Sequence, residues 1–399
     1  MKALGGRGEL GSSTEWINEG KVKILAPRLE GPPKKAPVFY NPAMELSRDL
    51  SVLAVRCYRG EAGRDLKACD AMAATGVRGI RFAVEAGGVE RVVLNDVRPS
   101  AYRLIKINVE ENGVKDVCEE TNMDANALLS LRSRPKDKFD VVDLDPFGSP
   151  APFLDSAVRG LREGGMLALT ATDMAPLCGA HPSSTLRKYG GFPLRTEYCH
   201  EIAVRLLIGC LASTAAKHDV GVEILFSHAT DHYVRVYAVS RRGATAANES
   251  VKKMGVIAHC FNCLHRSWLF DYFGGSPRCK VCGGRLSYAG PLWLGEIADR
   301  KFCERMLKEL EGRGFRLEGK ERKLLERIVE EAGGPPTYYA VEEVCGKLSL
   351  PPPRVEEVVS RLREKGFFAV RTHFKGSGVK TDADIGAVEE AVKELSGKA

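Results

Sequence analysis

The stretch Phe139-Asp-Val-Val-Asp-Leu-Asp-Pro-Phe-Gly-Ser-Pro150 is an apolar segment that runs into two carboxylates and then a proline. Residues 140–144 have the β-branched content of a buried strand. Pro146 has no N–H with which to continue a strand, so the chain must turn there. In an open α/β sheet, ligands bind at the carboxyl ends of the strands. We therefore expect Asp145, Pro146 and Phe147 at the rim of a pocket.

These three residues suit the binding of a planar amine. A carboxylate and the carbonyl of a fixed turn both accept hydrogen bonds from an –NH2 group, and an aromatic ring offers a face for a base. The simpler interpretation is an ordinary Asp-Pro turn at the end of a strand. The full Asp-Pro-Phe-Gly-Ser-Pro sequence after a strand favours the binding site.

The preceding segments have the pattern of an adenosine-binding unit. A strand at 66–70 leads into a turn of small residues at 71–79 and a helix at 80–86, and a second strand ends at Asp96, twenty residues past Gly76. Small residues let a cofactor approach the backbone, and an acid at the second strand tip accepts from ribose hydroxyls. The G-x-G-x-x-G motif is absent, so this spacing alone does not separate a nicotinamide from S-adenosylmethionine.

The end of the pattern separates these two cofactors. Helices and strands alternate as far as a helix at about 197–217, and two strand-like runs then follow closely, at 220–227 and 232–240. Adjacent strands with a short connection must be antiparallel. The sequence therefore predicts an α/β fold, a doubly wound Rossmann-like sheet of the S-adenosylmethionine-dependent methyltransferase kind with an antiparallel terminal hairpin.

A zinc-binding ribbon is predicted after this sheet. Cys260-Phe-Asn-Cys263 and Cys279-Lys-Val-Cys282 are two C-x2-C knuckles fifteen residues apart. Four thiolates close a tetrahedral Zn2+ site, so the metal is expected to be structural. Cations and aromatic residues alternate around the knuckles, which fits either a nucleic-acid contact or a spacer between domains; the aromatic residues are Phe261, Trp268, Phe270, Tyr272 and Phe273.

The remainder of the chain is expected to be mostly helical. Three helical segments and a strand at 367–372 resemble a winged helix, and a basic wing would contact a nucleic-acid backbone; its cations are Lys365, Arg371, Lys375 and Lys380. The predicted domains are a disordered tail at 1–13, the methyltransferase domain at 14–245, the zinc ribbon at 246–291, and a winged-helix-like, nucleic-acid-contacting domain at 292–399.

Composition limits the class of protein. The chain has 399 residues, 44% of them hydrophobic, and a net charge of +7, which permits a polyanionic partner. No apolar run reaches 18 residues and no signal peptide is visible, so we expect a cytoplasmic protein, no membrane partner and no obligate protein partner. Eight cysteines outside the ribbon are interpreted as small core residues; they are Cys57, Cys69, Cys118, Cys178, Cys199, Cys210, Cys303 and Cys345.

Several motifs together resemble the tRNA (guanine(26)-N2)-dimethyltransferase family, from about residue 15 to the C-terminus. The resemblance is carried by Glu19-Gly-Lys-Val-Lys-Ile24, Val38-Phe-Tyr-Asn-Pro42, Arg48-Asp49, Ala74-Thr-Gly-Val-Arg-Gly-Ile-Arg81, Asn95-Asp96, Asp124-Ala-Asn126, Asp143-Leu-Asp-Pro-Phe-Gly-Ser-Pro150, Thr170-Ala-Thr-Asp173, Ala175-Pro-Leu-Cys-Gly179, Arg187-Lys-Tyr189, Asp231-His-Tyr233 and Arg371-Thr-His-Phe374. Some archaeal members of that family lack the cysteine quartet, so the chemistry does not require zinc.

The resemblance implies roles for individual residues. Asp145 is the implied catalytic acid, beside Pro146 and Phe147, and Phe39 and Phe147 are implied to line a guanine pocket. S-adenosylmethionine would bind to Arg48, Arg78, Asp96, Val97, Asp124 and Ala125, with Asp96 on the ribose and Asp124 on the adenine amine. The implied activity is dimethylation of the N2 amine of a tRNA guanine. Two alternatives are an amino-methyltransferase acting on DNA and a non-catalytic zinc and winged-helix nucleic-acid-binding protein.

Overall fold

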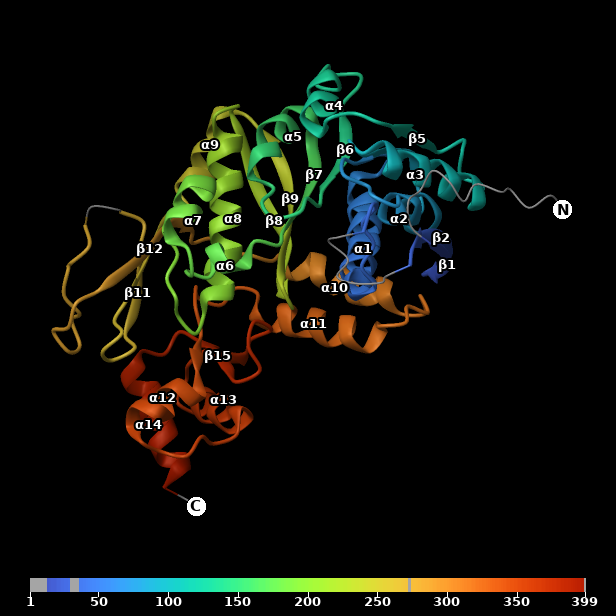
Figure 1. Ribbon diagram of the computed structural model, residues 1–399. Coiled ribbons are helices and arrows are strands. Elements are labelled where there is room, and N and C mark those ends of the chain that lie inside the picture. The colour runs from blue at the N-terminus through green and yellow to red at the C-terminus, as the bar shows by residue number, and fades with distance from the viewer. Residues whose placement is uncertain (1–12, 29–35, 272–273, 398–399) are drawn as a thin grey trace. The chain divides into compact units, whose positions relative to one another are not determined.

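A computed structural model of the chain describes residues 13–28, 36–271 and 274–397 (Figure 1). The predicted tail at 1–13 falls almost wholly outside them, and Tyr272 and Phe273 of the expected ribbon also lie outside them. Two compact units divide the chain. The first consists of Met1–Asp145, Asp155–Ala168 and Arg305–Arg322, and the second of Pro146–Leu154, Leu169–Glu304 and Lys323–Ala399. The domain boundaries expected at 245 and 291 stay a prediction.

Among the described residues, seven strands form one sheet in the order β5-β4-β3-β6-β7-β9-β8. Strand β3 pairs in parallel with both β4 and β6, and β4 pairs in parallel with β5. The chain adds strands on one side of β3 as far as β5 and then returns to add β6 on the other side, so the strand order reverses between β3 and β6. In doubly wound folds, ligands bind at this switch point. The strands are β3 (Leu66–Asp70), β4 (Val89–Asn95), β5 (Cys118–Thr121), β6 (Phe139–Leu144), β7 (Leu161–Ala171), β8 (Val220–Thr230) and β9 (Tyr233–Arg242).

The predicted terminal hairpin is confirmed. Strands β8 and β9 pair antiparallel along their whole length, and a two-residue turn at Asp231 and His232 joins them. Asp231 has a φ of 49°, a left-handed conformation that aspartate tolerates better than most residues. The parallel strands with this final hairpin confirm the Rossmann-like methyltransferase sheet.

The first turn of the sheet depends on close packing. Helix α2 (Val77–Arg81) is the next element after β3 and begins earlier than the helix expected at 80–86. One turn of π-helix, η3 (Phe82–Ala86), continues it. Gly79 faces β4 so closely that a Cβ there would collide with the side chain of Leu94. This close approach brings the side chains of α2 next to the carboxyl ends of the strands.

A hairpin precedes the sheet in the first unit. Strands β1 (Thr14–Glu19) and β2 (Val22–Pro27) are joined at Gly20, which has a φ of 56°. Asn108 accepts from the backbone N–H of Leu25 at 2.7 Å and donates to its carbonyl at 3.1 Å, which attaches β2 to α3 (Pro99–Glu111). The other elements in the first half of the chain are η2 (Pro42–Met44), α1 (Glu45–Ala62), α4 (Ala125–Leu131), η4 (Ala151–Phe153) and α5 (Leu154–Gly160).

Helix α8 (Cys199–Ala216) is the apolar centre of the second unit. Its length and composition would allow it to span a membrane. However, 67% of the helix is buried inside the protein, as in the core helix of a globular domain. It contacts β8 and β12. Shorter helices of this unit are α6 (Met174–Leu177), α7 (Pro182–Tyr189) and α9 (Ala244–Val251).

The ribbon and the C-terminal helices share a core within the second unit. The ribbon is a three-stranded sheet of β11 (Arg266–Leu269), β10 (Met254–His259) and β12 (Ser287–Trp293). Leu264, directly after the first knuckle, packs into the core of the C-terminal helices, and the ammonium of Lys347 donates to the carbonyls of Phe261 and Asn262 at 2.8 and 2.9 Å. These contacts attach the first knuckle to the helical region.

The C-terminal region is mostly helical, as expected, and its resemblance to a winged helix stays a prediction. A small sheet in the order β13-β15-β14 accompanies the helices. Its elements are β13 (Tyr339–Ala340), α12 (Val341–Leu348), α13 (Val355–Glu364), β14 (Ala369–Arg371), β15 (Gly378–Thr381) and the unexpected α14 (Ile385–Ser396); α10 (Arg300–Leu310) and α11 (Glu318–Glu331) precede them.

Candidate active site

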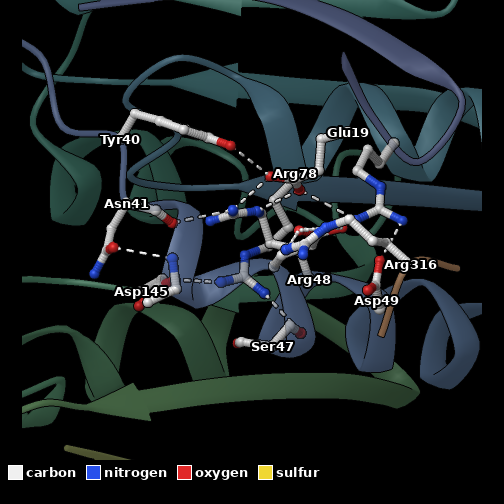
Figure 2. Close-up of polar contacts among 12 residues, drawn as sticks. Glu19, Tyr40, Asn41, Ser47, Arg48, Asp49, Arg78, Asp145 and Arg316 are labelled. Carbon is white, nitrogen blue, oxygen red and sulfur yellow. Dashed lines mark hydrogen bonds and ion pairs between the residues drawn. The ribbon is translucent and has the colours of Figure 1, made fainter. Parts of the chain in front are cut away.

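Arg78 lies where the tips of β3 and β6 meet, and Figure 2 shows it beside Asp145. Its guanidinium forms an ion pair with Asp145, and its Nε lies 3.7 Å from a carboxylate oxygen of Asp143. On the other side, Nη1 donates to Ser51 Oγ at 2.6 Å and lies 3.5 Å from the carbonyl of Ser47. Because Arg78 is only 5% exposed, these contacts fix the orientation of the Asp145 carboxylate.

Asp70 adds a third carboxylate to this cluster. It ends β3 beside Asp143, is 2% exposed, and accepts from the backbone N–H of Gly79 at 3.1 Å. Burial, together with the charge of Asp143, raises the pKa of Asp70 to about 7. One guanidinium therefore faces three acids, and Asp145 is the most exposed of them, at 21% of its side chain.

Arg48 is placed differently from the ligand role that the resemblance implies. Its guanidinium makes two hydrogen bonds of 2.5 Å to the carboxylate of Glu19, and it also donates to the carbonyl of Asn41 at 3.1 Å (Figure 2). Tyr40 donates to the same carboxylate at 3.0 Å. In this structure Arg48 holds the hairpin and the Val38-Phe-Tyr-Asn-Pro42 segment on α1, and its contact with the cofactor stays a prediction.

Asp96 organises the turn that was expected to receive a cofactor. One carboxylate oxygen accepts from the N–H of Ala74 at 3.0 Å and the other from the N–H of Arg98 at 2.9 Å. Ala74 and Gly76 have φ values of 51° and 82°, so the turn after β3 is sharply folded. Burial raises the pKa of Asp96. Each oxygen keeps a second lone pair, which fits acceptance from ribose hydroxyls.

The remaining predicted cofactor residues follow the next strand tips. Val97 is 63% exposed directly after Asp96. Asp124 is exposed and is the N-cap of α4, where it accepts from the N–H of Ala127 at 3.1 Å, and Ala125 behind it is buried. Asp124 is thus a helix cap, and its second carboxylate oxygen suits an adenine amine. These acceptors and the small-residue turn fit S-adenosylmethionine.

In the second unit, the loop after Asp145 is fastened to the end of β7. The N–H of Gly148 donates to Thr172 Oγ1 at 2.8 Å, and the N–H of Thr172 donates to the carbonyl of Gly148 at 2.9 Å. Asp173 then accepts from Tyr189 at 2.5 Å and from Lys188 at 2.8 Å. Phe147 is 53% exposed in this fixed loop, whereas Phe39, in the first unit, is half-buried.

The four ribbon cysteines converge as a metal site requires. The Sγ atoms of Cys260, Cys263, Cys279 and Cys282 all lie within 4.8 Å of one another. The N–H of Val281 also points at the sulfur of Cys279, 3.4 Å away, and the amide of Asn262 at that of Cys282, 3.3 Å away. Donors aimed at sulfur favour the thiolate form, so this donor set fits a structural Zn2+.

The prediction that four cations form a basic wing is wrong for one of them, and the other three are paired with acidic side chains. Lys380 is 2% exposed and donates to both carboxylate oxygens of Glu201 at 2.8 Å, so it cannot reach a nucleic acid. Arg371 pairs with Glu356, and Lys375 lies 2.8 Å from Glu342. Lys365 is held by Glu390 and Glu394. The sequence displays these cations but not the acids that neutralise them.

Sequence reasoning also missed the groups that orient Arg78. Ser47 and Ser51 are four residues apart on α1, a spacing that places both on one helix face, and this spacing was the available signal. Asp70 was visible as the last residue of a strand. Its neighbour across the sheet, Asp143, lies 73 residues away in sequence, so their proximity could only follow from the strand order.

Comparisons with known proteins agree with this geometry. The family model described as "TRM: N2,N2-dimethylguanosine tRNA methyltransferase" matches residues 20–393. A tRNA (guanine(26)-N(2))-dimethyltransferase of Methanosphaera stadtmanae is 41% identical over 383 residues, covering 96% of this chain and 97% of the relative. The corresponding protein of Pyrococcus horikoshii is 38% identical over 395 residues, covering 95% and 98%.

A solved structure extends the similarity to three dimensions. Trm1 from Pyrococcus horikoshii, in complex with S-adenosyl-L-methionine, superposes with a TM-score of 0.85 at 37% sequence identity. The match covers 95% of this chain and 99% of that one. A family model over nearly the whole chain, full-length relatives near 40% identity and a common fold lead to one conclusion: this chain belongs to the N2,N2-dimethylguanosine tRNA methyltransferase family.

Proposed function

We propose that this chain transfers methyl groups from S-adenosylmethionine to the N2 amine of a tRNA guanine, at position 26, to give N2,N2-dimethylguanosine. The observation that carries the proposal is Asp145, which follows β6 at the sheet's switch point and is held there by Arg78. The names of the full-length relatives supply the substrate and the position. A cytoplasmic location is part of the same proposal.

The chemistry of the amine explains why such a carboxylate is needed. The N2 lone pair of guanine is delocalised into the ring, so the amine is a poor nucleophile until acceptors bind its protons. The Asp145 carboxylate and the Pro146 carbonyl are two acceptors at one turn. Asp145 then takes up the proton released as the new C–N bond forms. Bound S-adenosylmethionine supplies the electrophilic methyl group, and no covalent enzyme intermediate is required.

Arg78 sets the state in which Asp145 works. A neighbouring guanidinium favours the ionised carboxylate, which only accepts hydrogen bonds. Arg78 contacts Oδ2 of Asp145, and its anchorage on Ser51 fixes the direction in which the carboxylate faces. A methyl transfer needs the reacting atoms in line, so a fixed acceptor contributes through positioning as well as through proton uptake.

The other predicted residues complete the proposed site. Asp96 and Val97 would hold the ribose side of S-adenosylmethionine, and Asp124 and Ala125 the adenine. Phe147 would offer its exposed ring to a guanine that has left its stack, and Phe39 has the same implied role. The ribbon, with Phe261, Trp268 and Phe270 at least 38% exposed, and the C-terminal helices are proposed to contact the tRNA body.

Nucleoside mass spectrometry tests the proposal. An unmodified tRNA transcript is incubated with S-adenosylmethionine and wild-type protein, Asp145→Asn or Asp116→Asn, the last being a control at an exposed aspartate. We expect N2,N2-dimethylguanosine with wild type and control, and a loss of about 100- to 10,000-fold in initial rate with Asp145→Asn. A transcript with adenosine at position 26 should stay unmethylated. Methylation of duplex DNA and not of tRNA would refute the proposal.

A further inference from the structure

A second cluster of metal-binding side chains lies in the second unit, outside the ribbon. Cys178 directly follows α6, and Cys199 and His200 are the first two residues of α8. Their ligand atoms, two Sγ and one ring nitrogen, all lie within 4.8 Å of one another, the same limit that the four ribbon cysteines satisfy. All three residues are half-buried. The sequence had suggested that Cys178 and Cys199 were isolated core residues.

This convergence is not what helix packing alone produces. Consecutive residues on a helix point about 100° apart, so neighbours in sequence do not normally face each other. Here Cys199 and His200 both turn toward one thiol from another segment. A common ligand gives the three side chains a reason to meet at one point, whereas a hydrogen bond between two thiols leaves the position of the histidine unexplained.

We propose that Cys178, Cys199 and His200 form a second zinc site. Two thiolates and an imidazole are borderline-soft donors, the set that Zn2+ prefers over Mg2+ or Ca2+. Ligand atoms arranged tetrahedrally around one zinc lie about 3.5–4 Å apart. The observed spread therefore needs only a small adjustment of side-chain torsions. A water molecule completes the coordination as the fourth ligand.

The surroundings favour a divalent ion. Two thiolates balance the charge of Zn2+, so the complex adds no net charge to a half-buried position. The cation near the cluster is Lys375, whose charge acts on both Cys199 and His200. Its ammonium is paired with Glu342 at 2.8 Å, which reduces its repulsion of a bound metal.

The position gives the second zinc a structural consequence. Helix α6 starts directly after Asp173, and the N–H of Cys178 donates to the carbonyl of Met174 at 2.8 Å. The metal would fasten this short helix to the start of α8, a helix it already contacts. Asp173 and Thr172, at the head of the same segment, hold Tyr189 and Gly148.

Zinc content by elemental mass spectrometry tests the proposal on the full chain, purified with zinc and dialysed against metal-free buffer. We expect two zinc ions per wild-type chain and one in Cys199→Ser and His200→Ala. Cys210→Ser is the matched control, because Cys210 lies on the same helix and its thiol donates to the carbonyl of Lys188 at 3.8 Å; it should keep two. One zinc in wild type, or two in both cluster variants, would overturn the site.

Alkylation of the wild-type protein provides a test that needs no variant. With zinc bound, Cys178 and Cys199 should react with N-ethylmaleimide much more slowly than after chelation, when peptide mass spectrometry should find both labelled. Equal labelling in the two states contradicts the proposal. So does failure to label either residue in denatured protein without reductant, because that result identifies a disulfide.

Discussion

Arg78 and Arg81 are three residues apart on the same short helix, and both are buried, yet their surroundings differ. Arg81 is enclosed by carboxylates from β1, α1 and η3: it lies 3.1 Å from Glu19, 2.6 Å from Asp49 and 2.7 Å from Glu85. None of these side chains is more than 2% exposed. The acidic partners of Arg78 lie at strand tips, and the last of them, Asp145, reaches solvent.

The difference separates an ion cluster that holds the fold from one that serves a site. The hydrogen bonds that Arg81 donates to Glu85 and the charges of Asp49 and Glu19 outweigh burial and raise the pKa of Arg81, so it stays charged throughout the accessible pH range. Its cluster is closed, and removing a member leaves charge that cannot be hydrated. Around Arg78 the exposed carboxylate can exchange its partner for a substrate amine.

The largest expected effect is on stability, when Arg81 is replaced. Arg81→Met leaves Glu19, Asp49 and Glu85 buried without their shared cation, and loss of one partner from a buried ion pair costs about 3–5 kcal/mol. We expect the urea midpoint to fall accordingly, whereas Arg91→Met, at an exposed pair, should not move it. A stable, fully active Arg81→Met protein would show that the two clusters do not differ in this way.

The second effect is on activity, when Arg78 is replaced. Arg78→Met should lower the methyl-transfer rate by about 100-fold or more because Asp145 loses its fixed orientation. The stability loss should be smaller than for Arg81→Met: Asp70 and Asp143 stay buried, but water can hydrate Asp145. An unchanged methyl-transfer rate would mean that Arg78 only supports the fold.

How far the sequence could predict these two clusters follows from where their members lie. Asp145 was predictable because the apolar strand, the proline and the turn are contiguous in sequence. The fold was predictable for a similar reason, since alternating strands and helices and a short final connection are local signals. The Arg81 cluster was not predictable, although Arg81 lies in a recognised motif. Glu19 is 62 residues away in sequence, and no local signal shows that the two residues meet.

Pairing and burial explain the other failures. The sequence shows Lys380 and Arg371 as open cations, but Glu201, on the distant helix α8, neutralises Lys380, and Glu356, on the preceding helix α13, neutralises Arg371. Conversely, Cys178 and Cys199 are single cysteines in sequence and meet only because α6 contacts α8. Charge and residue type are visible in a sequence, whereas the partner depends on tertiary packing.

A third effect comes from a shared proton at the edge of the Arg81 cluster. The Glu321 carboxyl is fully buried beside that of Asp49. Burial and this second acid raise the pKa of Glu321 to about 10, and burial also raises that of Asp49. The folded protein therefore holds a proton that the unfolded chain releases above pH 4.5. Its contribution to stability must fall as pH rises between those values.

Glu321→Gln tests that linkage, because the amide donates to Asp49 without needing a proton. We expect the variant to be more stable than wild type at pH 8, by about 1–2 kcal/mol, and the difference to vanish near pH 4.5. The measurement is the urea midpoint across pH, and Glu318→Gln, on the same helix and paired with Arg322 at 3.0 Å, serves as control. If the stability of wild type instead rises with pH more steeply than that of the variant, the proposal that Glu321 stays protonated in the folded protein is contradicted.

The smallest effect should come from Arg316, which also borders this cluster (Figure 2). It pairs with Glu45, but its own side chain is 67% exposed, whereas that of Glu45 is 10% exposed. Glu45 is the first residue of α1, so the positive end of the helix dipole stabilises its charge even without the arginine. An exposed guanidinium is well hydrated, and salt screens its attraction to a carboxylate. We therefore expect Arg316→Ala to leave the urea midpoint within error, at low and high salt alike. A loss of stability comparable to that of Arg81→Met would show that the closed cluster includes Arg316 at the surface. Exposure would then not be the property that separates a structural arginine from a dispensable one.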